Sequence, residues 1–348
     1  MTPRFVLPLR VGLVLAAFAA FGLNSAAHAQ SGTTYTYTLI DPVGTGTSVS
    51  GINDSGQIVG SYQDPADTSR TYGYVKAPND SYVTVSPFGS SSVAAYGIND
   101  AGLIVGTYIS RTPNTFNFYG YVGTPAGGFT TINPFSSAFA EALGVSSAGQ
   151  IAGDYQDPNS GPTPFGQGSI YGYVGSADNG FTKVDPFGSD KTVVHGINDS
   201  GQIAGYYVDP QTGHYLGYTG TVGSDTFVTI SPFGSTNASV LGINNAGQIV
   251  GVYQDPRSGG TYGYVGAVGS SSFTTVTPFD SGFADSRIEG INNVGQIVGS
   301  YRDPRTGMLY GFLGTPNAPV PEASSVVSFG LLLGLGGLGV SVRRRKAA

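Results

Sequence analysis

The sequence predicts an all-β fold, a six-bladed β-propeller, and three observations support this prediction. A motif close to Gly-Ile-Asn-x-x-Gly-Gln-Ile-Val-Gly occurs six times, and its copies begin at Gly51, Gly97, Gly144, Gly196, Gly242 and Gly290. The spacings between copies are 46, 47, 52, 46 and 48 residues, and periods of roughly 40–50 residues are typical of repeat architectures such as propellers. The strand that the sixth repeat lacks is found at the front of the chain, as a closed ring requires.

Four short strands are expected in each repeat. The first runs into Gly-Ile-Asn, the second is Gln-Ile-Val-Gly-x-Tyr, the third surrounds Tyr-Gly-Tyr, and the fourth is Phe-Thr-Thr-Val-x-Pro. Alternation and enrichment in Val, Ile, Thr, Tyr and Phe indicate strands, whereas clusters of Gly, Asn, Asp and Pro indicate turns. The hairpins at 53–56 and 244–247 are expected to hold their glycine at positive φ. The segments 255–259 and 303–307 are expected to form type I turns closed by a left-handed glycine.

The closing strand is expected at 35–42. The fourth strand of a repeat occurs at 82–87, 129–134, 181–186, 227–232 and 273–278, but the sixth repeat stops after Phe312. Because segment 35–42 matches the missing strand, we expect it to complete the sixth blade. An open β-solenoid is the alternative, and it would not need this strand returned from the other end of the chain.

The composition indicates a globular, β-rich protein. The chain has 348 residues with 55 Gly, 22 Tyr and 19 Phe, and a chain this aromatic can bury a core. The absence of Cys excludes disulfides, thiolate metal sites and Cys nucleophiles. Between residues 30 and 320 there are 9 basic and 20 acidic residues, a net charge of −11. This balance argues against nucleic acid as a partner, because that binding needs clustered Lys and Arg.

The first 29 residues have the layout of a secretory signal peptide. Arg4 and Arg10 precede an apolar run over 11–23, and Ala27 and Ala29 stand before an expected cleavage site at Gln30. A membrane anchor is the alternative, but 13 apolar residues are fewer than the roughly 20 needed to span a bilayer. We therefore expect export machinery and signal peptidase as partners, and a propeller over 30–314.

The end of the chain has a different composition. A linker is expected over 315–320, and an apolar segment at 326–342 lies at the low end of membrane-spanning length. A stop-transfer cluster follows, formed by Arg343, Arg344, Arg345 and Lys346. Such a cluster would hold the C-terminus in the cytoplasm.

This tail resembles the PEP-CTERM sorting signal of exopolysaccharide-producing Gram-negative bacteria. The resemblance rests on the apolar segment, the basic end and the motif formed by Val320, Pro321, Glu322, Ala323 and Ser324, in which Ala323 replaces the second proline of Pro-Glu-Pro. It covers 321–348 and the preceding valine. It implies processing by an exosortase, a transient stay in the inner membrane, and a destination at the cell surface or in the extracellular matrix.

The repeats over 34–312 resemble the HAF-type extracellular repeats that often accompany such tails. The likeness lies in the Gly-Ile-Asn-x-x-Gly-Gln-Ile-Val-Gly motif. The His-Ala-Phe triplet that names those repeats is Tyr-Gly-Tyr or Tyr-Gly-Phe in most repeats of this chain. That family has no established activity to carry over.

The repeated aspartates are assigned to turns. They precede proline in five repeats, as Asp64, Asp157, Asp209, Asp255 and Asp303. A ring of carboxylates could bind calcium, which takes six to eight oxygen ligands. Turn chemistry explains them better, because Asp at the first turn position bonds its own backbone and Pro sets φ. The Asn-Asp and Asn-Asn pairs of the motif are assigned to turns for the same reason, so no metal and no cofactor are expected.

The supply of catalytic side chains is small. Glu141 and Glu289 are the only glutamates of the repeat region, and His195 and His214 are its only histidines. No carboxylate pair suited to glycoside hydrolysis stands out from the repeated aspartates. His195 occupies a slot that holds Tyr or Leu in other repeats, so a packing or surface role is expected rather than that of a general base. No Ser-His-Asp arrangement, phosphate loop or metal-ligand spacing occurs.

The paired tyrosines of the third strands, such as Tyr72 and Tyr74, are expected to pack between blades, because residues two apart share one face of a strand. If some faced the central channel or a rim instead, they could stack on sugar rings.

The sequence therefore predicts a secreted, non-enzymatic propeller that serves as a surface or matrix binding module and has no catalytic residues. Extracellular polysaccharide is the candidate partner. The alternative is a propeller hydrolase acting on such a polysaccharide, which a change at Glu141 or Glu289 would inactivate.

Overall fold

The computed structural model describes residues 33–40, 47–112, 115–161, 168–280 and 285–317. The predicted signal peptide with its cleavage site (Ala27, Ala29 and Gln30) lies outside the described residues, as does the predicted sorting signal at 320–348 with its apolar and basic segments. In the part of the chain that is described, no helix has the length and apolar character needed to cross a membrane.

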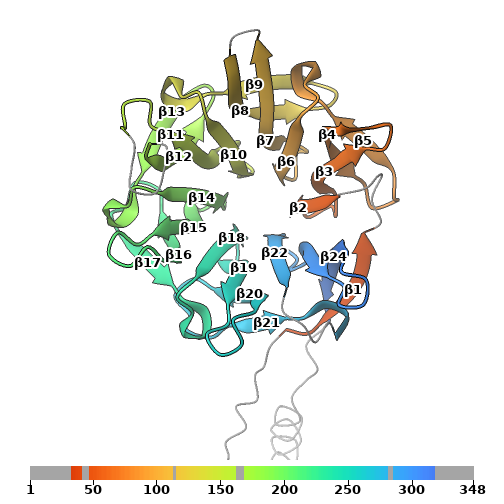
Figure 1. Ribbon diagram of the computed structural model, residues 1–348, viewed down its shortest axis with the longest axis vertical. Helices are drawn as coiled ribbons and strands as arrows, with labels where there is room; N and C mark the ends of the chain where they lie inside the picture. The colour runs from red at the N-terminus through yellow and green to blue at the C-terminus, as the bar shows by residue number, and fades with distance from the viewer. Residues whose placement is uncertain (1–32, 41–46, 113–114, 162–167, 281–284, 318–348) are drawn as a thin grey trace, which may run out of the picture. The chain divides into compact units, whose positions relative to one another are not determined.

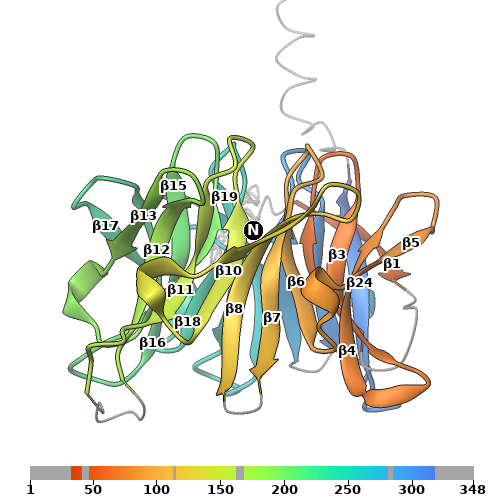
Figure 2. The same cartoon turned by 90° about the horizontal axis from the view of Figure 1, so that it is seen from above.

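Six four-stranded antiparallel sheets surround a central axis as blades (Figure 1). Figure 2 shows the same ring from the side, with neighbouring blades standing next to one another. The chain completes one blade before it starts the next, and blade 6 alone takes a strand from elsewhere. The protein is thus an all-β, six-bladed propeller, and the predicted fold class is confirmed.

Within a blade the strands follow one another from the axis outward. Blade 1 contains β2 (Ser48–Ile52), β3 (Ile58–Asp64), β4 (Asp67–Lys76) and β5 (Tyr82–Val85). Blade 2 contains β6 (Val93–Ile98), β7 (Ile104–Thr112), β8 (Thr115–Thr124) and β9 (Gly128–Ile132). Blade 3 contains β10 (Ala140–Val145), β11 (Ile151–Gln156), β12 (Ile170–Ser176) and β13 (Gly180–Val184). Blade 4 contains β14 (Thr192–Ile197), β15 (Gln202–Val208), β16 (Tyr215–Thr221) and β17 (Phe227–Ile230). Blade 5 contains β18 (Ala238–Ile243), β19 (Gln248–Gln254), β20 (Thr261–Ala267) and β21 (Thr274–Val276). Blade 6 contains β22 (Ser286–Ile291), β23 (Ile297–Arg302), β24 (Leu309–Pro316) and, outermost, β1 (Tyr35–Ile40).

The ring closes because β1, from the front of the chain, pairs antiparallel with β24, near its end. Beyond the ladder, the backbone N–H of Asn317 donates to the Thr34 carbonyl at 2.8 Å. The ring of Tyr37 meets the edge of Phe312 with the two ring centroids 5.6 Å apart. The predicted return of the missing strand is confirmed, and the open-solenoid alternative is wrong. β24 continues to Pro316, two residues past the boundary predicted at 314.

The second tyrosine of each Tyr-Gly-Tyr motif, or its counterpart, is buried in the core between blades. Tyr74, Tyr121, Tyr173, Tyr218 and Tyr264 are at most 1% exposed. Their hydroxyls donate to backbone carbonyls of the innermost strand, as from Tyr173 to Glu141 at 2.8 Å. A buried phenol needs such a partner, and here the bond also ties the third strand to the first. The predicted packing role is confirmed for these residues.

Glycines bring the blades into contact at the axis. A Cβ added to Gly51 would lie 3.3 Å from the Cα of Gly97, and one added to Gly290 would lie 3.2 Å from the Cα of Gly51. The equivalent glycines of the other blades make the same approach, so the contact runs around the ring. Any larger residue here would push two blades apart, which explains the glycine that opens each repeat.

A belt of side-chain hydrogen bonds also joins the blades. The Asn53 amide donates to the Asn99 carbonyl of the next blade at 3.1 Å, and Asn292 closes the circle by donating to the Asn53 carbonyl at 3.0 Å. The same bond runs from Asn99 to Ser146, from Asn198 to Asn244 and from Asn244 to Asn292. In blade 3, which lacks the amide, Ser147 donates to Asp199 instead. The side-chain oxygen of each of these asparagines also accepts a hydrogen bond from the backbone N–H of the residue four positions later, within the same turn. The turn role is confirmed, and the belt is a second role that the sequence did not reveal.

Blades 1 to 5 end in short 3-10 turns that were not predicted. These are η1 (Pro87–Gly89), η2 (Pro134–Ser136), η3 (Pro186–Gly188), η4 (Pro232–Gly234) and η5 (Pro278–Asp280). Their phenylalanines have φ between 55 and 65°, a region that residues other than glycine disfavour. Each ring packs on a tyrosine of the next blade, as Phe187 does on Tyr207 with centroids 4.4 Å apart. The contact between blades holds the unfavourable backbone in place.

Candidate ligand site in the central channel

A β-bulge displaces one residue of each innermost strand toward the axis. In blade 1 the register shifts between Val49 and Gly51, and an equivalent shift occurs in the other five blades. The skipped residues are Ser50, Tyr96, Leu143, His195, Leu241 and Glu289. Bulges re-aim side chains and are frequent next to active sites. The residue just before each Gly-Ile-Asn is therefore the one that the fold presents to the channel.

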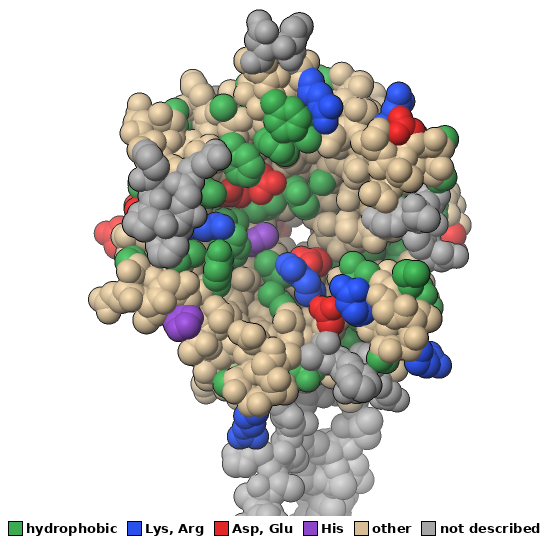
Figure 3. Space-filling model, in the orientation of Figure 1, with side chains coloured by type: hydrophobic (Ala, Val, Ile, Leu, Met, Phe, Trp, Pro, Cys, Tyr) green, Lys and Arg blue, Asp and Glu red, His purple; other side chains and the backbone are tan. Residues whose placement is uncertain are grey.

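These residues line a cavity of about 470 Å³ on the axis. Glu141 and Arg287, each two residues before a bulge residue, complete its polar wall. Figure 3 shows charged side chains of both signs around an opening in the middle of the ring. The volume falls within the roughly 300–1,000 Å³ of typical ligand pockets, so the cavity has room for a small molecule or for one or two units of a larger one.

Glu141 in the wall of the channel is paired with a second carboxylic acid, Asp154, which is buried and is not among the residues that line the cavity. Glu141 on β10 lies directly opposite Asp154 on β11, so both side chains point to the same face of blade 3. The Tyr96 hydroxyl of blade 2 hydrogen-bonds Glu141. Asp154 is 3% exposed, and its Oδ1 atom has no hydrogen-bond partner among the described residues. Buried acceptors without a donor are rare in proteins, so this atom needs an explanation.

An ion pair and a histidine occupy the other side. The Arg287 guanidinium lies 2.9 Å from the Glu289 carboxylate on the same strand. His195 on β14 contacts Tyr206 on β15, with ring centroids 5.7 Å apart. Burial lowers the pKa of His195 to about 4, and repulsion by Arg287 adds to this shift. The imidazole is therefore neutral at neutral pH and can both donate and accept a hydrogen bond.

Burial also sets the charge of the acids. It raises the pKa of Glu141, against the opposing effect of the Tyr96 hydrogen bond. It raises the pKa of Asp154 further, and the nearby Glu141 charge acts in the same direction. Two carboxyls this close cannot both ionise easily, so the pair holds on to a proton. Burial raises the pKa of Glu289 as well, with Arg287 opposing.

One prediction about these residues is wrong. A carboxylate pair does stand apart from the repeated aspartates, because β10 and β11 place Glu141 opposite Asp154. His195 packs on Tyr206, as expected, and does so in the wall of the cavity. His214 is not among the residues that line the cavity.

Sequence reasoning missed Asp154, Arg287, Tyr96 and Tyr206, although the repeats contain a signal for them. Where blade 3 has Asp154, the other repeats have Ser61, Thr107, Tyr206, Val252 and Ser300. Comparing the six repeats with one another would have shown that the channel-facing positions differ while the scaffold positions recur.

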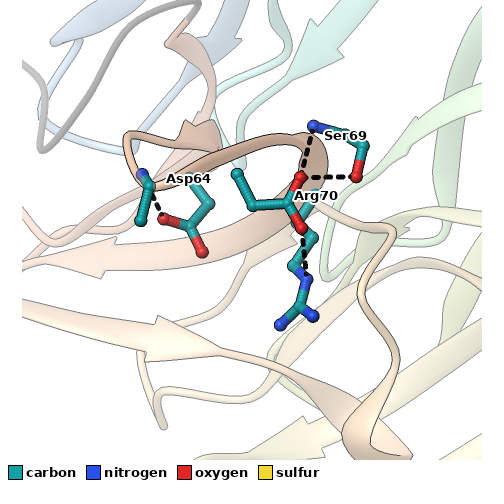
Figure 4. Close-up of polar contacts among 5 residues, drawn as sticks. Asp64, Ser69 and Arg70 are labelled. Atoms are coloured by element: carbon teal, nitrogen blue, oxygen red, sulfur yellow. Dashed lines mark hydrogen bonds and ion pairs between the residues drawn. The ribbon is translucent and has the colours of Figure 1, made fainter.

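The aspartates of the Asp-Pro turns are not among the residues that line the cavity. Asp64 accepts the backbone N–H of Ala66 at 2.9 Å, and Asp67 in the same turn accepts from Ser69 and pairs with Arg70 (Figure 4). The carboxylate of each of the other four repeated aspartates also accepts a hydrogen bond from the backbone N–H of the residue two positions later. Their predicted turn role is confirmed. Within the described ranges, no group of three or more His, Asp or Glu is arranged to hold a metal ion.

No protein-family model matches this sequence, and no curated protein sequence is similar to it. Among solved structures, TolB from Acinetobacter baumannii is 14% identical with a TM-score of 0.49, and the match covers 76% of this chain and 64% of TolB. The polysaccharide lyase Uly1 is 9% identical with a TM-score of 0.43, over 78% of this chain and 77% of the lyase. The Hadza microbial sialidase Hz136 is 14% identical with a TM-score of 0.37, over 67% of this chain and 61% of the sialidase. This chain spans less than two thirds of TolB, and likenesses this distant carry no argument about function.

Replacement of Asp154 by Asn is expected to stabilise the protein increasingly as the pH rises above the ordinary pKa of aspartate, about 3.9, and to change its stability little below that pH. A group whose pKa is raised by folding contributes stability that is present below its unfolded pKa and lost as the pH rises through its folded pKa. Asn keeps the shape but never ionises, so it avoids this loss. We expect a melting temperature a few degrees higher at pH 8, since 1 kcal/mol corresponds to about 2–4 °C for a chain of this size.

Thermal denaturation at pH 4, 6 and 8 measures this effect, with the exposed Asp225→Asn as the control. A variant that is less stable than the wild type at pH 8 would show that Asp154 serves the fold rather than a site.

Proposed function

We propose that this protein is an exported, non-enzymatic binding module whose ligand site is the cavity in the central channel. The observation that supports the proposal most is the distribution of the polar groups. All six blades share the glycine at the axis, and five of them share the belt asparagine and five the core tyrosine, yet the blades differ where side chains face the channel. Both glutamates of the repeat region, a histidine and an arginine gather there. An acid pair that lowers stability at neutral pH is typical of a functional site rather than of a scaffold.

Export and sorting complete the proposal. The signal-like residues 1–29 direct the chain out of the cytoplasm, and the tail at 320–348 halts in the inner membrane until an exosortase cuts near Pro321 and Glu322. The propeller then reaches the cell surface or the extracellular matrix, where polysaccharide is the abundant ligand. The sequence supports this step because three parts follow one another in the required order: the motif at 320–324, the apolar segment 326–342 and the basic cluster from Arg343 to Lys346.

Mass spectrometry of the C-terminus tests the sorting step. Protein from cells with an active exosortase is expected to end near residue 321, and protein from cells without that enzyme is expected to keep Lys346. Finding Lys346 in both preparations, with all protein in the membrane fraction, would contradict the sorting step and leave a permanent anchor.

Binding is tested separately with the full chain and polysaccharide from the producing cells. We expect saturable binding that weakens about tenfold or more in Tyr96→Phe, which removes the hydroxyl on Glu141, and that is unchanged in the control Asp225→Asn. Equal binding by both variants would show that the channel is not the site.

A hydrolase is the second candidate, because Glu141 and Asp154 face each other on neighbouring strands. Glycosidases use two carboxyls, one protonated and one ionised. New reducing ends released from the bound polysaccharide, and lost in Glu141→Gln, would favour the hydrolase. Binding without release favours the module.

A further inference from the structure

The charges around the cavity do not balance. Among the described residues that line the cavity, Glu141 and Glu289 are acidic, and the guanidinium of Arg287 is paired with Glu289. Asp154 lies opposite Glu141, outside the lining, and adds a third acid beside the wall. His195 is neutral at neutral pH. Glu141 therefore has no cation of its own among the described residues of the cavity wall. The Lys191 charge acts on Asp154, but the ammonium group of Lys191 lies 5.5 Å from the ring centre of Tyr215.

The acid pair also has unused acceptor capacity. Glu141 receives one hydrogen bond, from the Tyr96 hydroxyl. The Oδ1 atom of Asp154 receives none from the described residues, although it is buried. A buried acceptor without a donor is unfavourable. A cation bound at Glu141, the member of the pair that lines the cavity, would offset this cost through its charge.

We propose that Glu141, with the buried Asp154 directly behind it, binds the protonated amino group of an amino-sugar unit in a polysaccharide. A primary ammonium group offers three donors and a positive charge, and it accepts nothing. It supplies a cation and donors for the Glu141 carboxyl, which lines the cavity beside the second acid, Asp154. A neutral hydroxyl offers one donor and no charge, and the described residues do not assemble the oxygen cage that a divalent cation needs.

The other residues of the cavity suit the rest of a sugar unit. Tyr96 of the cavity wall offers an aromatic ring beside Glu141, on which the apolar face of a sugar ring can pack. His195 and the Arg287–Glu289 pair offer donors and acceptors across the channel for ring hydroxyls. The inference rests on the proposed binding function and names its ligand.

Several titratable groups surround the pair and take part in its proton balance. Tyr96 faces it from blade 2, Glu289 acts on Tyr96 from blade 6, and the remaining neighbours are Tyr173, Lys191, Tyr206 and Tyr218. The tyrosines stay neutral because burial raises the pKa of each one. The shared proton of the acid pair is therefore the one that leaves when an ammonium group binds, because the cation favours two carboxylates.

Isothermal titration of the full chain with three disaccharides of similar shape tests the proposal. These are the chitosan disaccharide, which carries two free amines, N,N′-diacetylchitobiose, and cellobiose. We expect the chitosan disaccharide to bind at least about tenfold more tightly than the other two, and its affinity to fall at least about tenfold in Glu141→Gln and in Asp154→Asn. Asp225→Asn should bind as the wild type does. Titration in two buffers of different ionisation enthalpy should show proton release at pH 7.

The other outcomes are distinct. If cellobiose or the acetylated disaccharide binds best, the ammonium inference is wrong while the binding function stands. If none of the disaccharides binds, and the polysaccharide of the producing cells does not bind either, both are wrong. If ethanolamine binds as tightly as the chitosan disaccharide, the ammonium is confirmed as the recognised group and the sugar assignment is overturned. Circular dichroism and melting of each variant confirm that the substitutions leave the fold intact.

Discussion

Deletion of residues 33–42 is expected to lower the melting temperature by about 10–20 °C and to make the protein aggregate. The deletion removes β1, so β24 becomes an edge strand with unpaired backbone groups that can pair with another chain. It also removes Tyr37 from its contact with Phe312 and exposes the surface that Ile40 covers. A loss of roughly 5–10 kcal/mol corresponds to this shift for a chain of this size. Differential scanning fluorimetry and size-exclusion chromatography measure the two effects.

Two point variants on β1 serve as a matched pair. Ile40 is 5% exposed and Leu39 is 50% exposed. We expect Ile40→Ser to lower the melting temperature by several degrees and Leu39→Ser to change it by about 1 °C or less. An intact melting temperature and a monomeric product after deletion of 33–42 would show that the ring does not depend on β1.

Replacement of Gly251 by Ala is expected to destabilise the protein by about 3 kcal/mol or more. A Cβ added here would lie 2.0 Å from the Ser239 carbonyl oxygen on the neighbouring strand. That oxygen is held in place because it also accepts the hydroxyl of Tyr264, so relief requires the two strands to separate. The melting temperature should fall by roughly 6–12 °C.

The control for this substitution is Gly161→Ala, because a Cβ at this exposed position meets no atom within 4 Å. Its melting temperature should stay within about 1 °C of the wild type. If Gly251→Ala were tolerated equally well, the close approach of the two strands would not be a requirement of the fold.

The fold could be predicted from the sequence because each of its features recurs. Six copies of one motif fix the blade count, and the alternation within each copy indicates four strands. The absence of the last strand after Phe312, and its presence at 35–40, predicts the closure that β1 and β24 make. The belt from Asn292 to Asn53 was not foreseen, because one asparagine can form a turn and reach the next blade at the same time.

The site could not be predicted in the same way, because its residues differ from one repeat to the next. Asp154 precedes a tyrosine rather than a proline, in a strand position that varies among the repeats, so only a comparison of the repeats with one another distinguishes it. The role of Asp154 follows from two structural features. One is the strand register that places it opposite Glu141, and the other is the bulge that turns Leu143 and His195 toward the axis. Register between strands and the position of a bulge are properties of pairing, so they are not read from one strand alone.

Ring closure also determines the order in which the protein can finish folding. The bond from Thr36 to Asn317 joins residues 281 positions apart, so a ribosome that adds about 5–20 residues per second delivers the second partner about 15–55 s after the first. During that interval blades 1 to 5 can stack in the order in which they are made, while the tyrosine-rich strand at 35–40 waits for its partner. The channel side chains come from all six blades, so they reach their final positions only when the last blade is complete. A chain that ends before blade 6 therefore lacks Arg287 and Glu289, and its channel stays open on one side even where Glu141 and His195 are in place.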